Sequence, residues 1–386
     1  MRIFAMRGAM RSSSHGRSGL LLAICLGLAA CQSSSVDDAL DVKSEKVESV
    51  SAGLETIGSG PLVIGMLTGL AGSATAAERD YRDGARLAAR QLGADQVTLA
   101  IYNARPNADA MNQGFAALKE KGAKLVIGPA RADLLAPLSA MPASARPPVL
   151  AFVSNGAAHG GGVFAFLTDE VDNAIEAAAY ASGAGRKKLF LVHDPSMGGA
   201  ALKRLRDGIE AEGVKIIAAV SSSGTGGSLA ASGATLQNAD VVMLAPGMKE
   251  PAQALAALRA TGAMAPNALV LGSAEMTAQR ALSGMLVCRV DQLSVGDVLE
   301  RYRTEFGRRM SKDAAYGFDA AALAIGIARA RGAEGLTART LGARSGFRGL
   351  LGAFRFTGTG AVERNCSIYR VADAKFELQD PAPEGF

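Results

Sequence analysis

The chain has 386 residues, of which 49% are hydrophobic and 46 are glycine, and it contains no tryptophan. This composition excludes a disordered chain, and the glycines lack the three-residue period of collagen. The formal net charge of +5 comes from 41 Lys+Arg and 36 Asp+Glu, but residues 1–30 hold four arginines and no acid. Without them, 37 basic residues face 36 acidic ones and no long basic run remains, so we expect no nucleic-acid partner.

The N-terminus reads as a targeting segment. Residues 2–17 are basic, and residues 19–30 (GLLLAICLGLAA) form an apolar run of twelve residues. As a helix this run would rise about 18 Å, which is short of the ~30 Å hydrocarbon core of a bilayer. The pattern therefore predicts a secretory signal peptide over residues 1–30.

The end of this segment, Leu28-Ala29-Ala30-Cys31, resembles the lipobox of bacterial lipoproteins. The resemblance implies that the Cys31 sulfur receives a lipid, that the mature chain begins there, and that its acyl chains anchor it stably to the membrane. Gln32, which is not an aspartate, follows the cysteine, and this favours the outer membrane. We therefore expect a lipid-anchored periplasmic protein, the alternative being a plain signal peptide with a chance cysteine.

Residues 31–60 are rich in Ser, Asp, Glu and Gly and predict a flexible tether with a reach of about 30 Å. From residue 61 apolar runs alternate with segments of helical period. Strands are predicted at residues 62–66, 97–102, 125–127 and 149–153, and helices at 81–92 and 108–121. The strands are apolar throughout, as parallel strands covered on both faces require.

The pattern restarts after a break. Helices are predicted at residues 172–182, 200–212, 228–237 and 250–261, and strands at 187–193, 214–220, 241–244 and 268–271. Further helices at 294–306 and 316–331 precede hairpin signals at 353–356, 367–371 and 375–378. The sequence thus predicts an α/β fold with two Rossmann-like lobes and parallel sheets, over residues 61–386. The first lobe covers about 61–165 plus a crossover helix, and the second about 180–290 plus C-terminal segments.

Few residues are available for disulfides or metals. Cys25 leaves with the signal peptide, so only Cys288 and Cys366 remain to pair in an oxidising compartment or to stay as two buried thiols. The sequence has no C-x-x-C, and the mature chain has only His159 and His193. We expect neither a metal site nor a cofactor.

The sequence also argues against an enzyme. His193, Asp194 and Ser196 supply the three residue types of a hydrolase triad, but they lie side by side on one predicted loop. Triads assemble from separated segments, with a buried acid that orients the base. No G-x-S-x-G or G-x-x-x-x-G-K-[ST] motif is present. We therefore expect a two-lobed binding protein.

Residues 61–378 resemble the type I periplasmic binding protein fold (periplasmic binding protein-like I), and within it the Leu/Ile/Val-binding protein family. The opening LVIGMLTGLAG…YRDGARLAARQL, the segments KLVIGP (124–129) and PPVLA (147–151), and later YGFDA (316–320) and GAFRF (352–356) follow that family's motifs in order. The resemblance implies two lobes hinged around a central cleft that closes on a ligand, an amino acid, peptide or muropeptide, for an ABC permease.

The resemblance places candidate ligand residues in loops after the strands. In the first lobe these are Ser73, Arg131, Asp133, Ser154 and Asn155, and in the second lobe Asp194, Met248 and Glu275. Ser154 and Asn155 could hold a carboxylate, Asp194 or Glu275 an α-ammonium group, and Met248 an apolar part of the ligand. Arg131-Ala132-Asp133 departs from the family, which usually has a small hydroxyl residue there.

A second reading stays open. The chain also resembles the penicillin-binding protein activators, outer-membrane lipoproteins that use the same fold to contact a peptidoglycan synthase. The segment RNCSIY (364–369) is similar to that family's "R-N-L-S", and PVLAF (148–152) to its "NVLALN". We expect residues 32–60 to be too short to hold that family's additional N-terminal helical-repeat domain. A solute-binding protein and an activator of a peptidoglycan synthase are therefore the two functions that the resemblance implies.

Overall fold

The computed structural model describes residues 50–72, 75–93, 95–157, 160–222, 227–292 and 296–386. The predicted signal peptide, the lipidation residue Cys31, the candidate ligand residue Ser73 and His159 lie outside these ranges. Among the described residues, no helix is both long and apolar enough to cross a bilayer.

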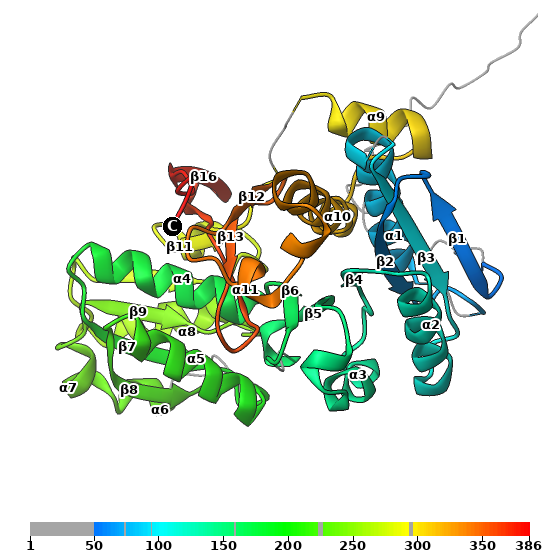
Figure 1. Ribbon diagram of the computed structural model, residues 1–386. Helices are drawn as coiled ribbons and strands as arrows, with labels where there is room; N and C mark the ends of the chain where they lie inside the picture. Colours follow the sequence, from blue (N-terminus) through cyan, green and yellow to red (C-terminus); the bar gives the residue numbers. More distant parts are fainter. Residues whose placement is uncertain (1–49, 73–74, 94, 158–159, 223–226, 293–295) are drawn as a thin grey trace, which may run out of the picture. The chain divides into compact units, whose positions relative to one another are not determined.

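The first lobe is built on a six-stranded sheet in the order β1-β3-β2-β4-β5-β6 (Figure 1). All neighbours are parallel except β1 and β3. Its strands are β1 (Gly53–Ile57), β2 (Leu62–Thr68), β3 (Val97–Asn103), β4 (Val126–Ile127), β5 (Val149–Ser154) and β6 (Val163–Leu167). Its helices are α1 (Ala76–Ala88), extended by a π-helical turn (Ala89–Gly93), α2 (Ala108–Glu120) and α3 (Ala136–Ala140).

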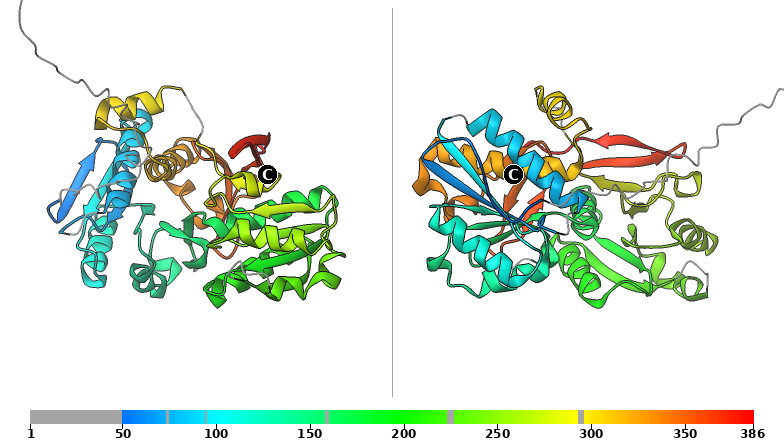
Figure 2. Two further views of the ribbon diagram at one scale, coloured as in Figure 1. Left: turned by 180° about the vertical axis from the view of Figure 1, so that it is seen from behind. Right: turned by 90° about the vertical axis from the view of Figure 1, so that its right-hand side faces the viewer.

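The second lobe is built on a seven-stranded sheet in the order β16-β15-β11-β10-β9-β7-β8. Its strands are β7 (Lys188–His193), β8 (Lys215–Ser221), β9 (Val241–Leu244), β10 (Leu269–Gly272), β11 (Leu286–Arg289), β15 (Ser367–Ala372) and β16 (Lys375–Asp380). Its helices are α4 (Glu170–Gly183), α5 (Gly199–Ala211), α6 (Gly227–Ala230), α7 (Gly233–Leu236) and α8 (Pro251–Ala260). The β15–β16 hairpin, red in Figure 2, adds antiparallel strands beside β11.

The chain then returns to the first lobe. There it forms α9 (Val298–Phe306), α10 (Lys312–Arg331), α11 (Ala338–Leu341) and a three-stranded antiparallel sheet of β12 (Phe347–Gly349), β13 (Gly352–Phe356) and β14 (Val362–Arg364). Short 3₁₀ turns lie at Ala132–Leu134, Ala143–Ala145, Asn155–Ala157, Arg280–Leu282 and Ala333–Gly335. The sequence order of the elements shows that three segments pass between the lobes: β6 to α4, β11 to α9 and β14 to β15.

The long helix α10 is buried on most sides, as its apolar sequence predicts, and it packs against α1 in the core of the first lobe. Two glycines make this contact close. A Cβ atom at Gly317 would lie 2.0 Å from the Tyr81 carbonyl oxygen, and one at Gly84 would lie 1.9 Å from that of Ala314. Only a residue without a side chain fits at these two positions.

The predicted α/β class with two parallel-sheet lobes is confirmed, because each lobe has its own sheet and its own buried core. One difference lies in the predicted tether, whose residues 53–57 form β1. Leu54 and Thr56 are exposed, their neighbours in the strand are half-buried, and the strand is held by backbone hydrogen bonds to β3. A composition rich in Ser, Glu and Gly hides such an edge strand. The predicted helix at 228–237 is two short helices, α6 and α7.

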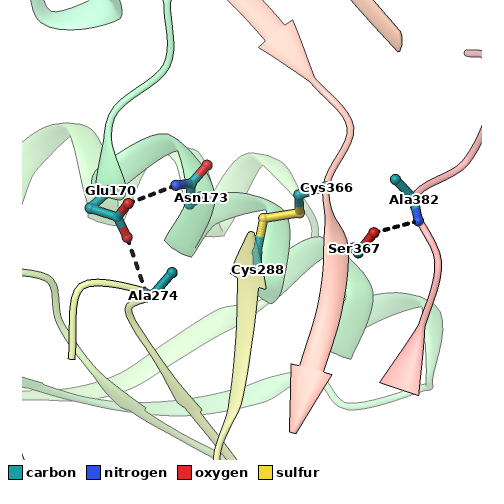
Figure 3. Close-up of a disulfide and its surroundings, with 7 residues drawn as sticks. All are labelled: Glu170, Asn173, Ala274, Cys288, Cys366, Ser367 and Ala382. Carbon is teal, nitrogen blue, oxygen red and sulfur yellow. Dashed lines mark hydrogen bonds between the residues drawn. A yellow bond between two sulfur atoms is a disulfide. The ribbon is translucent and has the colours of Figure 1, made fainter. Parts of the chain in front are cut away.

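Cys288 at the end of β11 and Cys366 just before β15 are joined by a disulfide (Figure 3), with their Cα atoms 5.6 Å apart. Of the two alternatives that the sequence leaves open, the structure has the pair and not two free thiols. The bridge lies inside the second lobe, between neighbouring antiparallel strands in which Cys288 is opposite Ile368.

Candidate functional site

Within each lobe the parallel strands end at a common edge, and the loops that follow them bring residues distant in sequence together. In the first lobe these loops follow β2, β4 and β5, and in the second lobe they follow β7, β9 and β10. The described candidate residues all lie in or beside these loops, and the side chain of Met248 is buried.

The loop after β2 contains a buried acid that the sequence analysis missed. Glu78, in the first turn of α1, is 4% exposed. Its Oε1 accepts the Gly69 N–H at 2.9 Å, and its Oε2 accepts the Thr75 hydroxyl at 3.1 Å, while Thr75 Oγ1 caps the helix by accepting the Glu78 N–H. Burial raises the pKa of Glu78, and the hydrogen bonds from Thr75 and Gly69 and the nearby charge of Arg131 oppose this shift. The T-x-x-E spacing of a capping box could have identified it.

Arg131 and Asp133 follow β4 and form an exposed pair. Arg131 Nε and Nη2 donate to Asp133 Oδ1 and Oδ2 at 3.1 and 2.6 Å. The hydrogen bond from Arg131 lowers the pKa of Asp133. Two nitrogens of the Arg131 guanidinium are therefore paired with a carboxylate of the chain itself, in the bidentate geometry that a ligand carboxylate would otherwise use.

Asn155 and Ser154 follow β5. The Asn155 side chain donates from Nδ2 to the Val362 carbonyl and accepts the Val362 N–H at Oδ1, both at 2.7 Å. Asn155 therefore pins β14 to the first lobe, and its amide makes the same two hydrogen bonds that a backbone partner would make. Ser154 is half-buried at the end of β5, opposite Leu167.

Asp194 follows β7 and closes a turn. Its Oδ1 accepts the Ser196 N–H at 2.8 Å and the Ser196 hydroxyl at 2.6 Å. These hydrogen bonds, together with the Lys249 backbone and charge, lower the pKa of Asp194. The Ser196 hydroxyl thus faces the acid, while His193 Nδ1 contacts the Asp194 carbonyl oxygen. This arrangement lacks the nucleophile-to-base hydrogen bond of a triad.

Glu275 and Met248 belong to the loops after β10 and β9. The exposed Glu275 carboxylate accepts the Gly247 N–H, which ties the two loops together. Met248, predicted to line an apolar part of the ligand site, is 7% exposed and packs in the core of the second lobe. Asp194, Glu275 and the neighbouring Lys249 thus gather at one edge of the second sheet.

A further acid completes this edge. Glu170, in the first turn of α4, accepts the Ser273 hydroxyl at 2.5 Å with Oε2. The same oxygen accepts the Ala274 N–H at 3.2 Å, and Oε1 accepts from Asn173 Nδ2 (Figure 3). The preceding residue, Asp169, caps α4. The Glu170 partners Ser273 and Ala274 lie more than 100 positions away, so no local pattern identifies them.

An acidic cluster lies where α4 faces the three-stranded sheet. Burial raises the pKa of Glu176 to about 7, reinforced by Glu212, Glu363 and Asp172 and opposed by Arg355. Asp172, which pairs with Arg204, has a pKa of about 6 for the same main reason.

This cluster gives a testable pH dependence. A carboxyl whose pKa is raised on folding stabilises the fold most below its unfolded pKa, and that contribution is lost as the pH rises through about 7. We therefore expect Glu176→Gln to raise the unfolding free energy at pH 8 by about 1–2 kcal/mol and to flatten the decline between pH 5 and pH 8. Urea denaturation at the two pH values measures this, with the exposed Glu120→Gln as the matched control. An unchanged pH profile in Glu176→Gln would contradict it.

Several cavities lie away from these loops, and two of them are lined by charged side chains as well as apolar ones. One, of about 430 Å³, lies at the amino ends of β10 and β11 and is lined by Arg259, Asn267 and Arg370 among others. The other, of about 360 Å³, lies between α10 and β12 and is lined by Asp319 and Arg348 among others. Within the described part of the chain, no three His, Cys, Asp or Glu side chains are grouped so as to hold a metal ion.

Comparisons with known proteins agree with the two-lobed architecture. The family model described as "Periplasmic binding protein" matches residues 61–375. No curated protein matched the sequence.

Many solved structures are similar, and three of them illustrate the likeness. A Rhodospirillum rubrum protein whose name refers to a branched-chain amino acid ABC transporter has a TM-score of 0.64 and 21% identity, covering 82% of this chain and 99% of that one. An ABC transporter substrate-binding protein from Desulfitobacterium hafniense in complex with Leu has a TM-score of 0.52 and 20% identity, covering 82% and 99%. Full-length LpoA from Haemophilus influenzae has a TM-score of 0.62 and 16% identity, covering 86% of this chain but only 60% of LpoA. At these identities the likeness shows the fold.

Proposed function

The chain belongs to the periplasmic binding protein family, and on this premise we propose that it is a lipid-anchored solute-binding protein that closes its lobes on a small amino-acid-like ligand for an ABC transporter. The observation that carries the proposal is the gathering of polar side chains at the carboxyl ends of parallel strands in both lobes. Such strand ends are where open α/β sheets bind ligands. The family is one of binding proteins and not of enzymes.

The connections between the lobes support closure. Three segments pass from one lobe to the other, and short multiple crossings of this kind allow hinge motion of two rigid halves. The ligand class follows the solved relatives, of which one was crystallised with Leu. The anchor is the lipid on Cys31 predicted from the lipobox, in the outer membrane because Gln32 follows it.

The test of ligand binding uses the full chain, expressed with its signal, extracted in detergent and screened by thermal shift. Saturating leucine, isoleucine, valine, short peptides and muropeptides are the probes. Binding at about 100 times the dissociation constant stabilises the folded state by about 2.7 kcal/mol, which raises the melting temperature by several degrees. A flat response to every probe would contradict solute binding. In parallel, Cys31→Ser is expected to move the protein from the membrane fraction to the soluble fraction.

A second candidate is an activator that contacts a peptidoglycan synthase. It is favoured by the likeness to LpoA, although this chain spans only 60% of that protein. The matching experiment is affinity capture of a bifunctional peptidoglycan synthase from detergent-extracted membranes, with the tagged chain as the bait. Membranes that contain the tag alone are the control. Absence of enrichment would count against this candidate.

A further inference from the structure

Four backbone N–H groups in the loops at the strand ends donate to carboxylates of the chain itself. In the first lobe, Glu78 takes the Gly69 N–H. In the second lobe, Asp194, Glu275 and Glu170 take the N–H groups of Ser196, Gly247 and Ala274. Backbone N–H groups at such loops and helix ends are the donors that a ligand carboxylate would use. A free carboxylate that enters these loops therefore finds these four donors occupied.

Glu78 is the most firmly built of these internal acids. Both of its carboxylate oxygens accept hydrogen bonds, and the residue is 4% exposed. Its Oε1 lies so close to Gly69 that a Cβ atom there would be 2.4 Å away. The carboxylate thus fills the space beside the loop as well as using its donor, and displacing it would leave a buried acid without partners.

The charges around the loops act in the same direction. Glu78, Asp133, Asp194, Glu170 and Glu275 are acidic, whereas the Lys and Arg residues of these loops are Arg131 and Lys249. Arg131 donates hydrogen bonds from two of its nitrogens to Asp133. An incoming anion is repelled by this surplus, while an ammonium group is attracted, and the exposed Glu275 is the acid best placed to receive it.

We propose that the ligand is an amine-bearing, amino-acid-like molecule whose carboxyl group is masked as an amide or a peptide bond, and that Glu78 is a specificity-determining residue against the free carboxylate. This inference rests on the proposed solute-binding function and names its ligand class. A carboxyl group masked as an amide carries no charge and needs no anion-binding site. Its neutral carbonyl oxygen is satisfied by a single hydrogen bond from the protein or from water.

The experiment is titration calorimetry of the full, detergent-extracted chain with three matched probes: leucinamide, leucine and N-acetylleucine. We expect leucinamide to bind at least about tenfold more tightly than leucine, with N-acetylleucine the weakest. Leucine binding as tightly as leucinamide would overturn the inference while leaving solute binding intact. Absence of heat from all three, together with a flat response in the wider panel, would overturn solute binding and this inference with it.

Variants then test the residues. Glu78→Gln keeps the size of the side chain and removes its charge. We therefore expect leucine to bind more tightly, and the ratio of the leucine to the leucinamide dissociation constant to fall at least threefold. Glu275→Gln should lower the affinity for leucinamide. Glu120→Gln, at an exposed position, should leave the affinities for leucine and leucinamide unchanged. A leucinamide preference that stays unchanged in a folded Glu78→Gln protein would overturn the role of Glu78. The wild-type comparison of leucine with leucinamide decides the ligand class even where a variant fails to fold.

Discussion

Asp319→Ala is expected to lower the unfolding free energy by about 3–5 kcal/mol, because it removes one partner of a buried ion pair. Asp319 lies on α10 with its side chain 1% exposed, and the side chain of Arg364 on β14 is fully buried. The two Asp319 oxygens accept the N–H groups of Leu350 and Leu351 at 2.6 and 3.1 Å, and Arg364 Nη1 lies 3.9 Å from Oδ2. The substitution leaves two backbone donors and one cation without this acceptor.

The surroundings of Arg364 explain why the loss is large. Its guanidinium lies over the rings of Phe166, Tyr316 and Phe354, at 4.5–5.6 Å from their centroids. Nη1 also donates to the Leu351 carbonyl at 3.1 Å. An aromatic enclosure stabilises a cation but cannot replace the hydration of its full charge.

Urea denaturation of Asp319→Ala and of the exposed Arg348→Gln, which pairs with Glu384 on the surface, provides the matched comparison. The surface variant should change the unfolding free energy by less than about 1 kcal/mol. A loss in Asp319→Ala no larger than in Arg348→Gln would show that the buried pair contributes little. A double variant that also removes the charge, Asp319→Ala with Arg364→Met, should recover part of the loss.

The structural role of Arg364 changes the interpretation of the segment Arg364-Asn365-Cys366-Ser367. Its similarity to the activator family is one reason that the sequence suggests a peptidoglycan synthase as partner. In the structure Arg364 is a core residue, Asn365 donates to the carbonyls of Pro383 and Gly385, and Ser367 accepts the Ala382 N–H. The segment serves the fold of the first and second lobes, so its presence does not discriminate between a transporter and a cell-wall partner.

The strands that the sequence predicted well are those buried on both faces. β3, β5 and β9 are continuous apolar runs bounded by polar residues, and their predicted limits agree with the structure within one residue. β1, β6, β11, β12 and β14 were not predicted. The edge strand β1 and the three-residue strands β12 and β14 depend on a neighbouring backbone, which leaves little trace in local composition. β6 and β11 are short buried apolar runs that the sequence analysis missed. α1 begins five residues earlier than predicted, at the cap formed by Thr75.

The candidate site was predictable in its position and not in its interactions. Polar residues after strands indicated the correct edge of each sheet, because that edge follows from parallel topology. The use of each side chain depends on partners that fold back from elsewhere: Asn155 binds Val362, 207 positions away, and Glu170 binds Ser273. These contacts are decided by tertiary structure, which explains why Glu78 and Glu170 were overlooked and why Met248 is a core residue.

Removal of the disulfide is expected to have a comparable effect on stability. Cys288 and Cys366 are 78 positions apart in the sequence, and closing a loop of that length restricts the unfolded chain by roughly 4 kcal/mol in the loop-entropy model. Both residues are buried, at 1% and 8% exposure, so Cys288→Ser and Cys366→Ser also place a hydroxyl among apolar neighbours. We expect the double serine variant to lose about 2–5 kcal/mol of unfolding free energy.

The loss should be specific to the bond and to the second lobe. Denaturation of the wild type with and without a reductant separates the bridge from the substitution, since the reduced wild type keeps its sulfur atoms in place. We expect the reduced wild type to approach the double serine variant, and a reductant to leave that variant unchanged. Hydrogen exchange should increase first in β11 and β15, which the bridge joins, and not in β2 or β3 of the first lobe. Equal stability of the oxidised and reduced wild type would contradict a stabilising bridge and would leave the pairing of β11 with β15 to their backbone hydrogen bonds alone.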